Sequence, residues 1–460
     1  MLSKTVADYL RANRARHVAS LKELLSIPSI ANVTGEKVDS CRTAAQWLAR
    51  HLSALGLSAE VVPAGGKPNV LAEGRAGDGL PTLLIYGHYD VQPPDPLELW
   101  ASKPFEPAQR DGFLYARGAS DNKGQIFAHL TALEAWVRAG GGLPVNVKVI
   151  IEGEEEIGSP NLDPFIRQHA DRLRSDAIII SDSGFFAEGV PSITYSLRGL
   201  AYFEITLTGP AADLHSGSHG GAVVNPINAL ARLIAGMQDA DGRVTLPGFY
   251  DDVLPLTDQE RSAWADLPFD ESAYARELGV DKAAGGETGY SILERRWARP
   301  TLDANGIVGG YIEPGAKTVI PARASAKVSC RLVPNQDPEK ITAGMRQYLD
   351  ANVPAGTRVE LAVHATARPV MVSQDAPAMN AAKAALAEAF GAEPVMVRCG
   401  ASVPITELFQ RILGRDGVLM GFGLPADSIH SPNERFKLEQ FYRGAVAAAA
   451  LLQNVRDAGL

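Results

Sequence analysis

Four glutamates stand within five positions in the segment Glu152-Gly153-Glu154-Glu155-Glu156, directly after an apolar run that ends at Ile151. Packing like charges just beyond a buried strand costs free energy unless cations or protons offset them. A glutamate that accepts a proton from water, beside one that binds a metal ion, is the arrangement that amide hydrolysis needs. From these residues alone, that chemistry and a solvated acidic turn are equally good interpretations.

Two further segments place a histidine or a carboxylate at the end of an apolar run. In Gly87-His88-Tyr89-Asp90, the side chains of His88 and Asp90 point to the same side of an extended backbone. His88 could therefore bind a metal ion while Asp90 orients its ring. Asp182 follows the apolar run 177–181. A solvated turn also explains each segment taken singly.

Asp121 and His430 complete the set of candidate metal ligands. Asp121, in Gly118-Ala119-Ser120-Asp121-Asn122-Lys123-Gly124, stands where a loop enters a helix, so it is either an N-cap or a carboxylate that bridges two metal ions. His430 lies in Ile429-His430-Ser431-Pro432-Asn433-Glu434, where a lone histidine is more often structural. Taken together, two histidines and three carboxylates suit two divalent ions of borderline hardness, such as zinc, manganese or cobalt.

The elements that would position these residues follow from the apolar spacing. Helices are predicted at 4–26, 39–54, about 122–138 and near 161–173, and strands at 69–73, 82–87, 145–151 and 177–181. Apolar strands that alternate with helices predict an α/β fold with a mostly parallel sheet flanked by helices. The carboxyl ends of such strands are where these sheets place their sites.

The pattern changes near residue 195. Residues 201–208 alternate apolar with polar side chains, which indicates a half-buried strand, and further strands are predicted at 307–312, 324–333 and 358–365. Two helices are predicted to begin at Asn225-Pro226 and Asp337-Pro338, each an N-cap residue followed by proline at N1. The resulting order β-α-β-β-α-β predicts a ferredoxin-like α+β unit, with a helical excursion near 240–300.

The pattern after residue 370 again resembles that of the residues before 195. Helices are predicted there at 376–390, 402–412 and 439–454. The second unit is therefore expected to be an insertion. The predicted division is a first domain made of 1–194 and 371–460, with an inserted domain at 195–370.

Composition narrows the class of protein. The 460 residues are 46% hydrophobic and 21% charged, which suffices for two domains, and the net charge of -9 argues against nucleic acid as a partner. No apolar run is long enough to predict a membrane span, and residues 1–20 contain no apolar signal core. Three widely separated cysteines, Cys41, Cys330 and Cys399, predict a reducing, cytoplasmic location without disulfides.

The five motifs occur in the order found in a family of dinuclear metallopeptidases, which the sequence resembles from about residue 10 to 455. That family includes cytosolic nonspecific dipeptidases, carnosinases, aminoacylases and glutamate carboxypeptidases. The similarity is greatest to the dipeptidase branch, in Gly87-His88-Tyr89-Asp90-Val91-Gln92-Pro93, Asp213-Leu214-His215-Ser216-Gly217 and Arg331-Leu332-Val333-Pro334-Asn335. The resemblance implies a zinc-exopeptidase-like catalytic domain and an inserted ferredoxin-like domain that serves as lid and in dimerisation.

The resemblance also implies the activity and the metal ligands. The activity would be hydrolysis of dipeptides or similarly small peptide-like substrates by a water that two divalent ions activate, with zinc ahead of manganese or cobalt. The five implied ligands form two pairs and one bridge: His88 with Asp182, Glu156 with His430, and Asp121 between them. Glu155 would be the general base and later the acid to the leaving amine, and Asp90 would support His88.

The inserted domain is implied to complete the site. His215 would stabilise the oxyanion, and in this family it comes from the partner subunit of a homodimer. Arg331 would hold the substrate carboxylate by a bidentate pair, and Thr318 and Ser402 would contact the substrate. His219, close to His215, is predicted to have a structural role.

Two observations limit what the resemblance implies for substrate binding. Arg331 could simply be an outward strand residue, because the polar residues Ser325, Lys327 and Ser329 share its face. Near Ser402 the family's dipeptidases usually carry an acidic residue and two glycines, where this chain has Cys399-Gly400-Ala401. The shape of the substrate pocket is therefore open.

Two alternative functions remain at this point. An N-acyl amino-acid deacylase or a carboxypeptidase of the same family would share the metal ions and the base. A non-enzymatic binding protein with the same fold would be expected to lack metal ligands or the base, and this sequence has all of them.

Overall fold

The computed structural model describes residues 1–32, 38–400 and 404–460, and the chain divides into two compact units. The first unit joins Met1–Tyr195 to Val372–Val397 and Pro404–Leu460, so it is built from both ends of the chain. The second unit contains Ser196–Met371 and the short segment that begins at Arg398.

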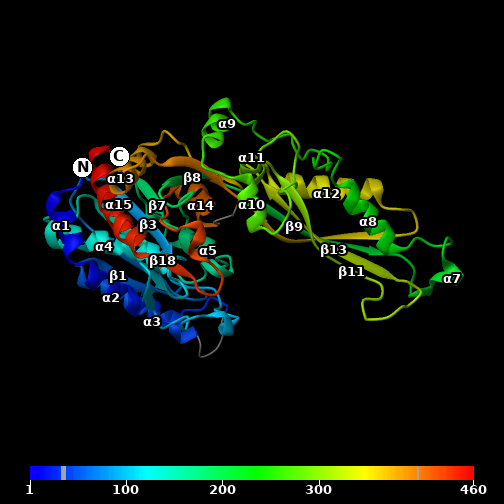
Figure 1. Ribbon diagram of the computed structural model, residues 1–460, viewed down its shortest axis with the longest axis horizontal. Coiled ribbons are helices and arrows are strands. Elements are labelled where there is room, and N and C mark those ends of the chain that lie inside the picture. Colours follow the sequence, from blue (N-terminus) through cyan, green and yellow to red (C-terminus); the bar gives the residue numbers. More distant parts are fainter. Residues whose placement is uncertain (33–37, 401–403) are drawn as a thin grey trace. The chain divides into compact units, whose positions relative to one another are not determined.

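A mixed sheet lies at the centre of the first unit (Figure 1). Its strand order is β1-β2-β6-β3-β7-β17-β8-β15, with β16 also paired to β8, and the edge strand β15 comes from the second unit's part of the chain. The strands are β1 (Ser58–Val62), β2 (Asn69–Gly74), β3 (Thr82–His88), β6 (Asn146–Glu152), β7 (Ala177–Ile180), β8 (Ser192–Leu197), β15 (Val370–Met371), β16 (Val395–Cys399) and β17 (Gly417–Leu419). The four central strands, β6, β3, β7 and β17, pair in parallel, whereas β1, β2, β8 and β15 pair antiparallel. The predicted parallel sheet is thus the central part of a wider mixed one.

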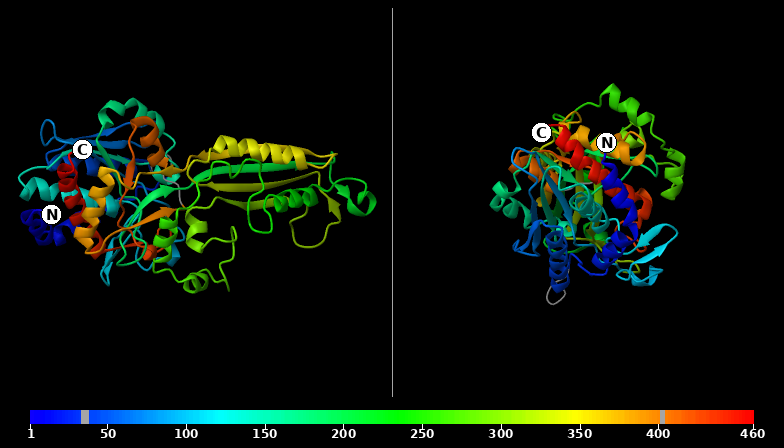
Figure 2. Two further views of the ribbon diagram at one scale, coloured as in Figure 1. Left: turned by 90° about the horizontal axis from the view of Figure 1, so that it is seen from above. Right: turned by 90° about the vertical axis from the view of Figure 1, so that its left-hand side faces the viewer.

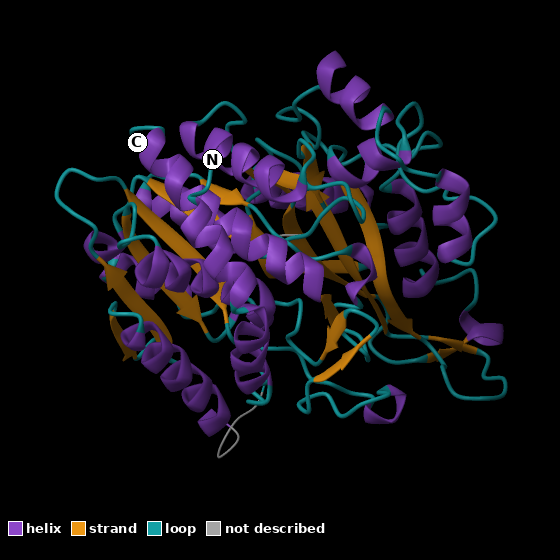
Figure 3. Ribbon diagram, turned by 60° about the vertical axis from the view of Figure 1, so that its left-hand side comes forward, coloured by secondary structure: helices purple, strands orange, loops and turns teal. Residues whose placement is uncertain are grey.

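Helices flank this sheet, as predicted (Figure 3). They are α1 (Lys4–Ala12), α2 (Arg14–Leu25), α3 (Val38–Ala54), α4 (Lys123–Ala139), α5 (Leu162–Gln168), α6 (Ala170–Leu173), α13 (Pro377–Phe390), α14 (Pro404–Leu408) and α15 (Leu438–Asp457), with short turns at Leu97–Leu99, Glu155–Ile157, Phe409–Leu413 and Pro425–Asp427. Strand β3 contacts a layer on each side: Gly87 lies against Ile126 of α4, and the ring of Tyr86 meets Phe409 edge-on. Helix α4 is buried along most of its length, and its buried polar residues Lys123, Gln125 and His129 are hydrogen-bonded.

Three predicted helices are divided or only partly described. The helix predicted at 4–26 is divided at Asn13, and the one at 161–173 at His169, because each residue leaves the helical backbone conformation. The helix predicted at 402–412 begins in part outside the described residues and is seen from Pro404. A small sheet, β18-β5-β4, is formed by β4 (Ala108–Arg110), β5 (Phe113–Tyr115) and β18 (Arg435–Lys437).

The second unit has the predicted ferredoxin-like order of elements. Its antiparallel sheet, β11-β13-β9-β14, is made of β9 (Gly199–Thr208), β11 (Thr301–Gly309), β13 (Arg323–Leu332) and β14 (Arg358–Ala367), and its long strands lie alongside one another (Figure 2, left). Helices α8 (Pro226–Gly236) and α12 (Pro338–Asn352) pack on it through a core that includes Phe203, Ile205 and Leu207. Strand β11 was predicted at 307–312, but it begins earlier, at Thr301, and ends at Gly309, where the next residue, Gly310, takes a positive φ of 70°.

Shorter elements complete the second unit. They are β10 (Leu214–His215), α7 (Ser216–His219), α9 (Asp258–Ala265), α10 (Glu271–Glu277), α11 (Ile292–Trp297) and β12 (Val319–Ile320). Cys41, Cys330 and Cys399 are all free thiols. Within the described residues, no helix is both long and apolar enough to cross a membrane.

Candidate metal centre

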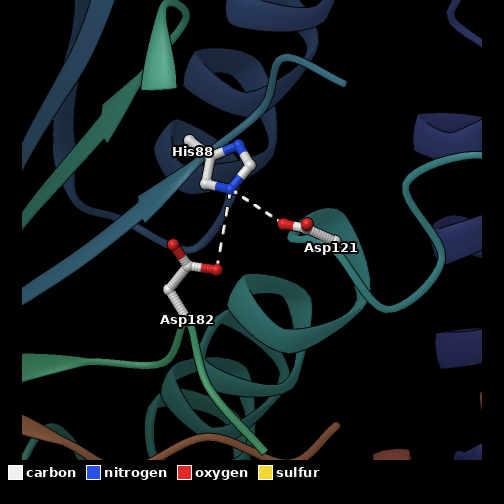
Figure 4. Close-up of side chains that lie close together, drawn as sticks. All are labelled: His88, Asp121 and Asp182. Atoms are coloured by element: carbon white, nitrogen blue, oxygen red, sulfur yellow. Dashed lines mark hydrogen bonds and ion pairs between the residues drawn. The ribbon is translucent and has the colours of Figure 1, made fainter. Parts of the chain in front are cut away.

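The carboxylate of Asp121 lies between two histidines of the first unit. Its Oδ1 is 3.1 Å from Nε2 of His88, and its Oδ2 is 3.0 Å from Nε2 of His430. Figure 4 shows the His88 ring facing Asp121 and Asp182, with Asp182 Oδ1 at 3.7 Å from the same nitrogen. One carboxylate with an oxygen toward each histidine is the geometry expected of a bridging ligand.

Two groups of three residues follow from this arrangement. We call His88, Asp121 and Asp182 the first site, and Asp121, Glu156 and His430 the second site; in each, the potential ligand atoms all lie within 4.8 Å of one another. Each site offers one imidazole nitrogen and two carboxylate oxygens, a donor set that suits a divalent ion of borderline hardness. The residues present therefore fit a pair of divalent ions that share Asp121.

The parallel strands explain why residues far apart in the sequence meet here. His88 is the last residue of β3 and pairs in register with Glu152 at the end of β6, while Asp182 follows β7 by two residues. The carboxyl ends of adjacent parallel strands lie at the same edge of a sheet. Asp121 enters from the loop before α4, and the residue at the N-cap position is Asn122, so Asp121 is not the helix cap that the sequence also allowed.

Asn122 connects the ligands of the first site, a role that sequence reasoning missed. Its Nδ2 donates to the carbonyl of Ser181 at 2.6 Å and to Asp182 Oδ1 at 3.0 Å, and its Oδ1 accepts from the His88 amide at 3.4 Å. The sequence signal was only its place beside Asp121. An amide that donates on one side and accepts on the other can fix two strand ends at once.

Asp90 contacts His88, as predicted, and it also contacts residues of the glutamate cluster. Its Oδ1 lies 3.4 Å from Nδ1 of His88, and its backbone oxygen lies 3.1 Å from the same nitrogen. The same carboxylate accepts from the amides of Glu155 and Glu156, at 3.3 and 3.1 Å. One buried carboxylate therefore orients a histidine and holds the turn Glu155–Ile157.

The four clustered glutamates separate into two pairs. Glu152 is buried and accepts from the hydroxyls of Tyr86 and Ser159, and Glu154 accepts from Asn161 and from the Lys67 amide. Burial raises the pKa of Glu152 to about 8, which favours the protonated form of this side chain. Glu155 and Glu156 instead face the histidines, with Glu155 Oε2 at 4.0 Å from Nε2 of His88.

The carboxylates around Glu155 make the site strongly attractive to cations. Burial raises the pKa of Glu155 to about 9, with Asp182, Asp121 and Glu156 acting in the same direction and His88 against it. Bound cations reverse this effect, because a nearby positive charge favours the ionised carboxylate. The pKa of Glu155 thus depends on the charges held by its neighbours.

His430 belongs to the second site, with its Nε2 at 3.0 Å from Glu156 Oε2. Hydrogen bonds to Asp121 and Glu156 raise the pKa of His430 to about 10. Its φ of 60° is unusual for a residue with a side chain, and such conformations persist where the surrounding structure enforces them. Gln92 also belongs to this region, since its Nε2 donates to the backbone oxygen and to Oε2 of Glu156 at 3.1 and 2.9 Å.

The second unit brings two of its predicted residues together. His215 and Thr318 are both exposed, with His215 Nε2 3.4 Å from Thr318 Oγ1, and the short strands β10 and β12 pair beside them. Arg331 is half-buried on β13, and it acts with burial to lower the pKa of Arg198 to about 10. Ser402 lies outside the described residues.

Comparison with known proteins gives one family. The family described as peptidase family M20/M25/M40 matches residues 84–454. The chain is 33% identical to human Beta-Ala-His dipeptidase over 98% of its own length and 92% of the relative, and 35% identical to the Cys-Gly metallodipeptidase DUG1 of Saccharomyces cerevisiae over 84% and 82%. It superposes on an M20 family metallo-carboxypeptidase from Sulfolobus solfataricus with a TM-score of 0.83 and 35% identity, over 96% of this chain and 99% of that one.

Proposed function

The chain belongs to peptidase family M20/M25/M40, and from this premise we propose that it is a metal-dependent dipeptidase whose five ligands are His88, Asp121, Glu156, Asp182 and His430. The observation that carries the proposal is the Asp121 carboxylate, which presents one oxygen to the histidine of each site. Dipeptide hydrolysis is supported by the two dipeptidase relatives.

In this proposal, different residues of the chain have different roles in hydrolysis. Two divalent ions, zinc in our proposal with manganese or cobalt as alternatives, would supply electrophilic polarisation and make water more acidic when bound. Glu155 accepts the proton of the attacking water and returns it to the leaving amine. Asp90 holds the backbone amide of Glu155, so the base is fixed relative to His88.

The second unit supplies groups for the substrate in this proposal. His215 stabilises the oxyanion, and Arg331 binds the substrate carboxylate, while Thr318 and Ser402 contact the substrate. Support comes from the exposure of His215 and Thr318 side by side. We also propose a homodimer in which His215 acts in the partner's site, and a cytoplasmic location, which three free thiols favour.

The test is a substrate panel on chelator-stripped protein with manganese, zinc or cobalt added back. The panel contains free dipeptides, N-acetyl amino acids and N-capped dipeptides. Metal-restored cleavage of the free dipeptides alone is the expected result, because both substrate termini would be recognised. No cleavage of free dipeptides with any of the three metals would contradict the proposal.

A second candidate, a carboxypeptidase activity, is favoured by the similarity to the Sulfolobus solfataricus metallo-carboxypeptidase. The N-capped dipeptides distinguish the two, since a carboxypeptidase releases the C-terminal residue from a capped substrate. Cleavage of the capped compounds would assign the protein to that class. Cleavage of the N-acetyl amino acids would indicate a deacylase.

A further inference from the structure

A buried ion pair joins the two loops that carry Asp121 and His430. Arg117 is 1% exposed and Glu434 is 0% exposed, and Arg117 Nη1 lies 2.7 Å from Glu434 Oε2. Neither residue is among the candidate metal ligands. Removing one partner of a buried pair leaves an uncompensated charge, so such pairs fix local geometry strongly.

Glu434 also accepts the backbone amides that lead to Asp121. Its Oε2 accepts from Gly118 at 2.9 Å, and its Oε1 accepts from Ser120 and Asp121, each at 3.0 Å. With the Arg117 guanidinium, each carboxylate oxygen therefore receives two donors. Because the Asp121 amide itself is bound, the position of the Asp121 backbone depends directly on Glu434.

The strand pairing next to Glu434 brings the same segments together. Strand β18 pairs with β5 from Lys437–Phe113 to Arg435–Tyr115, and the Ala116 amide then donates to the Glu434 backbone oxygen at 3.1 Å. The backbone hydrogen bonds between β18 and β5 are thus followed directly by the side-chain hydrogen bonds of Glu434. The loop before α4 is laid along the segment that follows His430.

The loop of His430 is anchored on both sides by further contacts. Before it, Asp427 accepts from Ser120 Oγ at 2.8 Å. After it, Asn433 accepts from the Ala101 amide and donates to the Leu99 carbonyl, both at 2.8 Å. These anchors explain how His430 is kept at positive φ, with its ring toward Asp121.

Arg117 extends the network toward the third residue of the second site. Its Nη2 donates to the Pro93 carbonyl at 3.1 Å, and the neighbouring Gln92 donates to Glu156. All three residues of the second site are therefore connected to this ion pair. His88 and Asp182 of the first site are instead held by Asp90 and Asn122, and Asp90 also accepts from the Glu156 amide.

We infer that Glu434, held by Arg117, is a positioning residue that sets the geometry of the second metal site; this rests on the metal ligands proposed above. The consequence is asymmetric. Loss of the Glu434 carboxylate weakens binding at the second site by about 10–100-fold, the usual effect of removing a group that orients metal ligands. Binding at the first site changes less, because only Asp121 is shared.

The test compares Glu434→Gln and Arg117→Lys with the wild-type protein. A glutamine amide has one acceptor oxygen, so it cannot receive all four donors, whereas lysine keeps the charge but loses the fork that reaches both Glu434 and Pro93. Cobalt and zinc affinities are measured by competition with a chelator on full-length, folded protein, and the visible spectrum of the cobalt-loaded protein is recorded. If Glu434→Gln does not fold, the metal affinities of Arg117→Lys provide the test.

A matched control is available in the second unit. Arg299 and Glu287 form another buried pair, with Nε 2.7 Å from Oε2, and neither belongs to the metal network. Glu287→Gln should lower the stability without changing either metal affinity. This separates a general loss of stability from a specific effect on the second site.

The outcomes are distinguishable. For Glu434→Gln we expect the affinity of the second site to be weaker and that of the first site to be nearly unchanged. The visible spectrum of the cobalt-loaded protein should also change. Two ions bound with wild-type affinities in both variants would overturn the inference and leave the proposed metal ligands standing. A wild-type protein that binds no divalent ion would overturn the metal ligands and the inference together.

Discussion

At the scale of single residues, the carboxylates of this region differ in what their hydrogen bonds leave free. Glu152 and Glu154 use their oxygens on neighbouring hydroxyl, amide and side-chain donors. Asp90 uses its oxygens on two amides and on His88. Glu155 makes no comparable side-chain bond among the described residues apart from its approach to His88, which fits the proton-accepting role that we propose for it.

Glu155→Gln should therefore abolish most turnover while metal binding remains. Loss of a general base typically costs about 10²–10⁴-fold in rate. The rate constant kcat and the metal content should be measured on the same preparation. Activity within about tenfold of wild type would exclude the assigned role, since so small a loss is below the range for a general base.

Asp90→Asn should lower both metal affinity and kcat, because the amide nitrogen cannot accept and one of the three contacts is lost. The expected reduction is about 10–100-fold in metal affinity or activity. A chelator competition together with kcat, compared with Glu155→Gln, checks this. A variant that loses rate with wild-type metal affinity would limit Asp90 to holding the base.

At the scale of elements, a hydrogen bond joins helix α4 to the residue that follows strand β7, next to the candidate metal ligand Asp182. His129 of α4 is 2% exposed, and its Nε2 lies 2.7 Å from Oγ of Ser181, which itself donates to the Met420 carbonyl. Ser181 precedes Asp182, so this contact helps to fix the end of β7. A neutral imidazole is required here, because burial lowers the pKa of His129 to about 4.

This burial predicts a loss of stability as the pH falls. The unfolded chain takes up the His129 proton near pH 6.5 and the folded chain only near 4, so acidification between these values favours unfolding. From about pH 7.5 to about pH 5, the contribution is about 2 kcal/mol in the free energy of unfolding. Urea unfolding of wild type and His129→Asn at both pH values, at equal metal content, should show that part of the pH dependence only in wild type.

At the scale of the whole molecule, the second unit presents an apolar edge. Strand β11 lies at the end of the sheet order and exposes Ile307 by 58% and Val308 by 62%, and Ile312 just beyond is 76% exposed. Exposed apolar edge strands favour pairing with another chain. A second copy of this chain is the partner that we propose, because the proposed role of His215 requires it.

Mixing two inactive variants tests that dimer. If His215 acts in the partner's site, a Glu155→Gln chain and a His215→Ala chain should together recover activity. In each mixed dimer, one site then has both an intact Glu155 and an intact His215. Random exchange makes half of the dimers mixed, so about a quarter of the sites recover. The steady-state rate before and after exchange of subunits measures this.

The control for that experiment is the same mixture with Ile307→Asp and Val308→Asp in both chains. Removing two buried aliphatic side chains from an interface should weaken it by about 100-fold or more, so complementation should disappear. Light scattering on each variant gives the oligomeric state. Full activity of an unmixed His215→Ala chain would exclude the role of His215.

The sequence by itself determined the order and kind of the elements and the residue types available for chemistry. Period-two alternation identified the strand at 201–208, and Phe203, Ile205 and Leu207 are indeed buried in the core of the second unit. The apolar runs 82–87 and 145–151 predicted parallel strands with a candidate site at their ends, and the parallel pairing is confirmed. These features are local, because spacing along the chain sets which face of an element is buried.

Only the tertiary structure decided which polar groups meet. The residue pattern alone left the four clustered glutamates equivalent, and only the family resemblance separated Glu155 and Glu156 from the others. In the structure, Glu152 and Glu154 bind neighbouring donors, while Glu155 and Glu156 face the histidines. The sequence alone assigned no role to Glu434, yet its carboxylate accepts from backbone amides more than 300 positions earlier in the chain. Such contacts have no periodicity, because they depend on how distant segments pack around one buried charge rather than on the conformation of either segment alone.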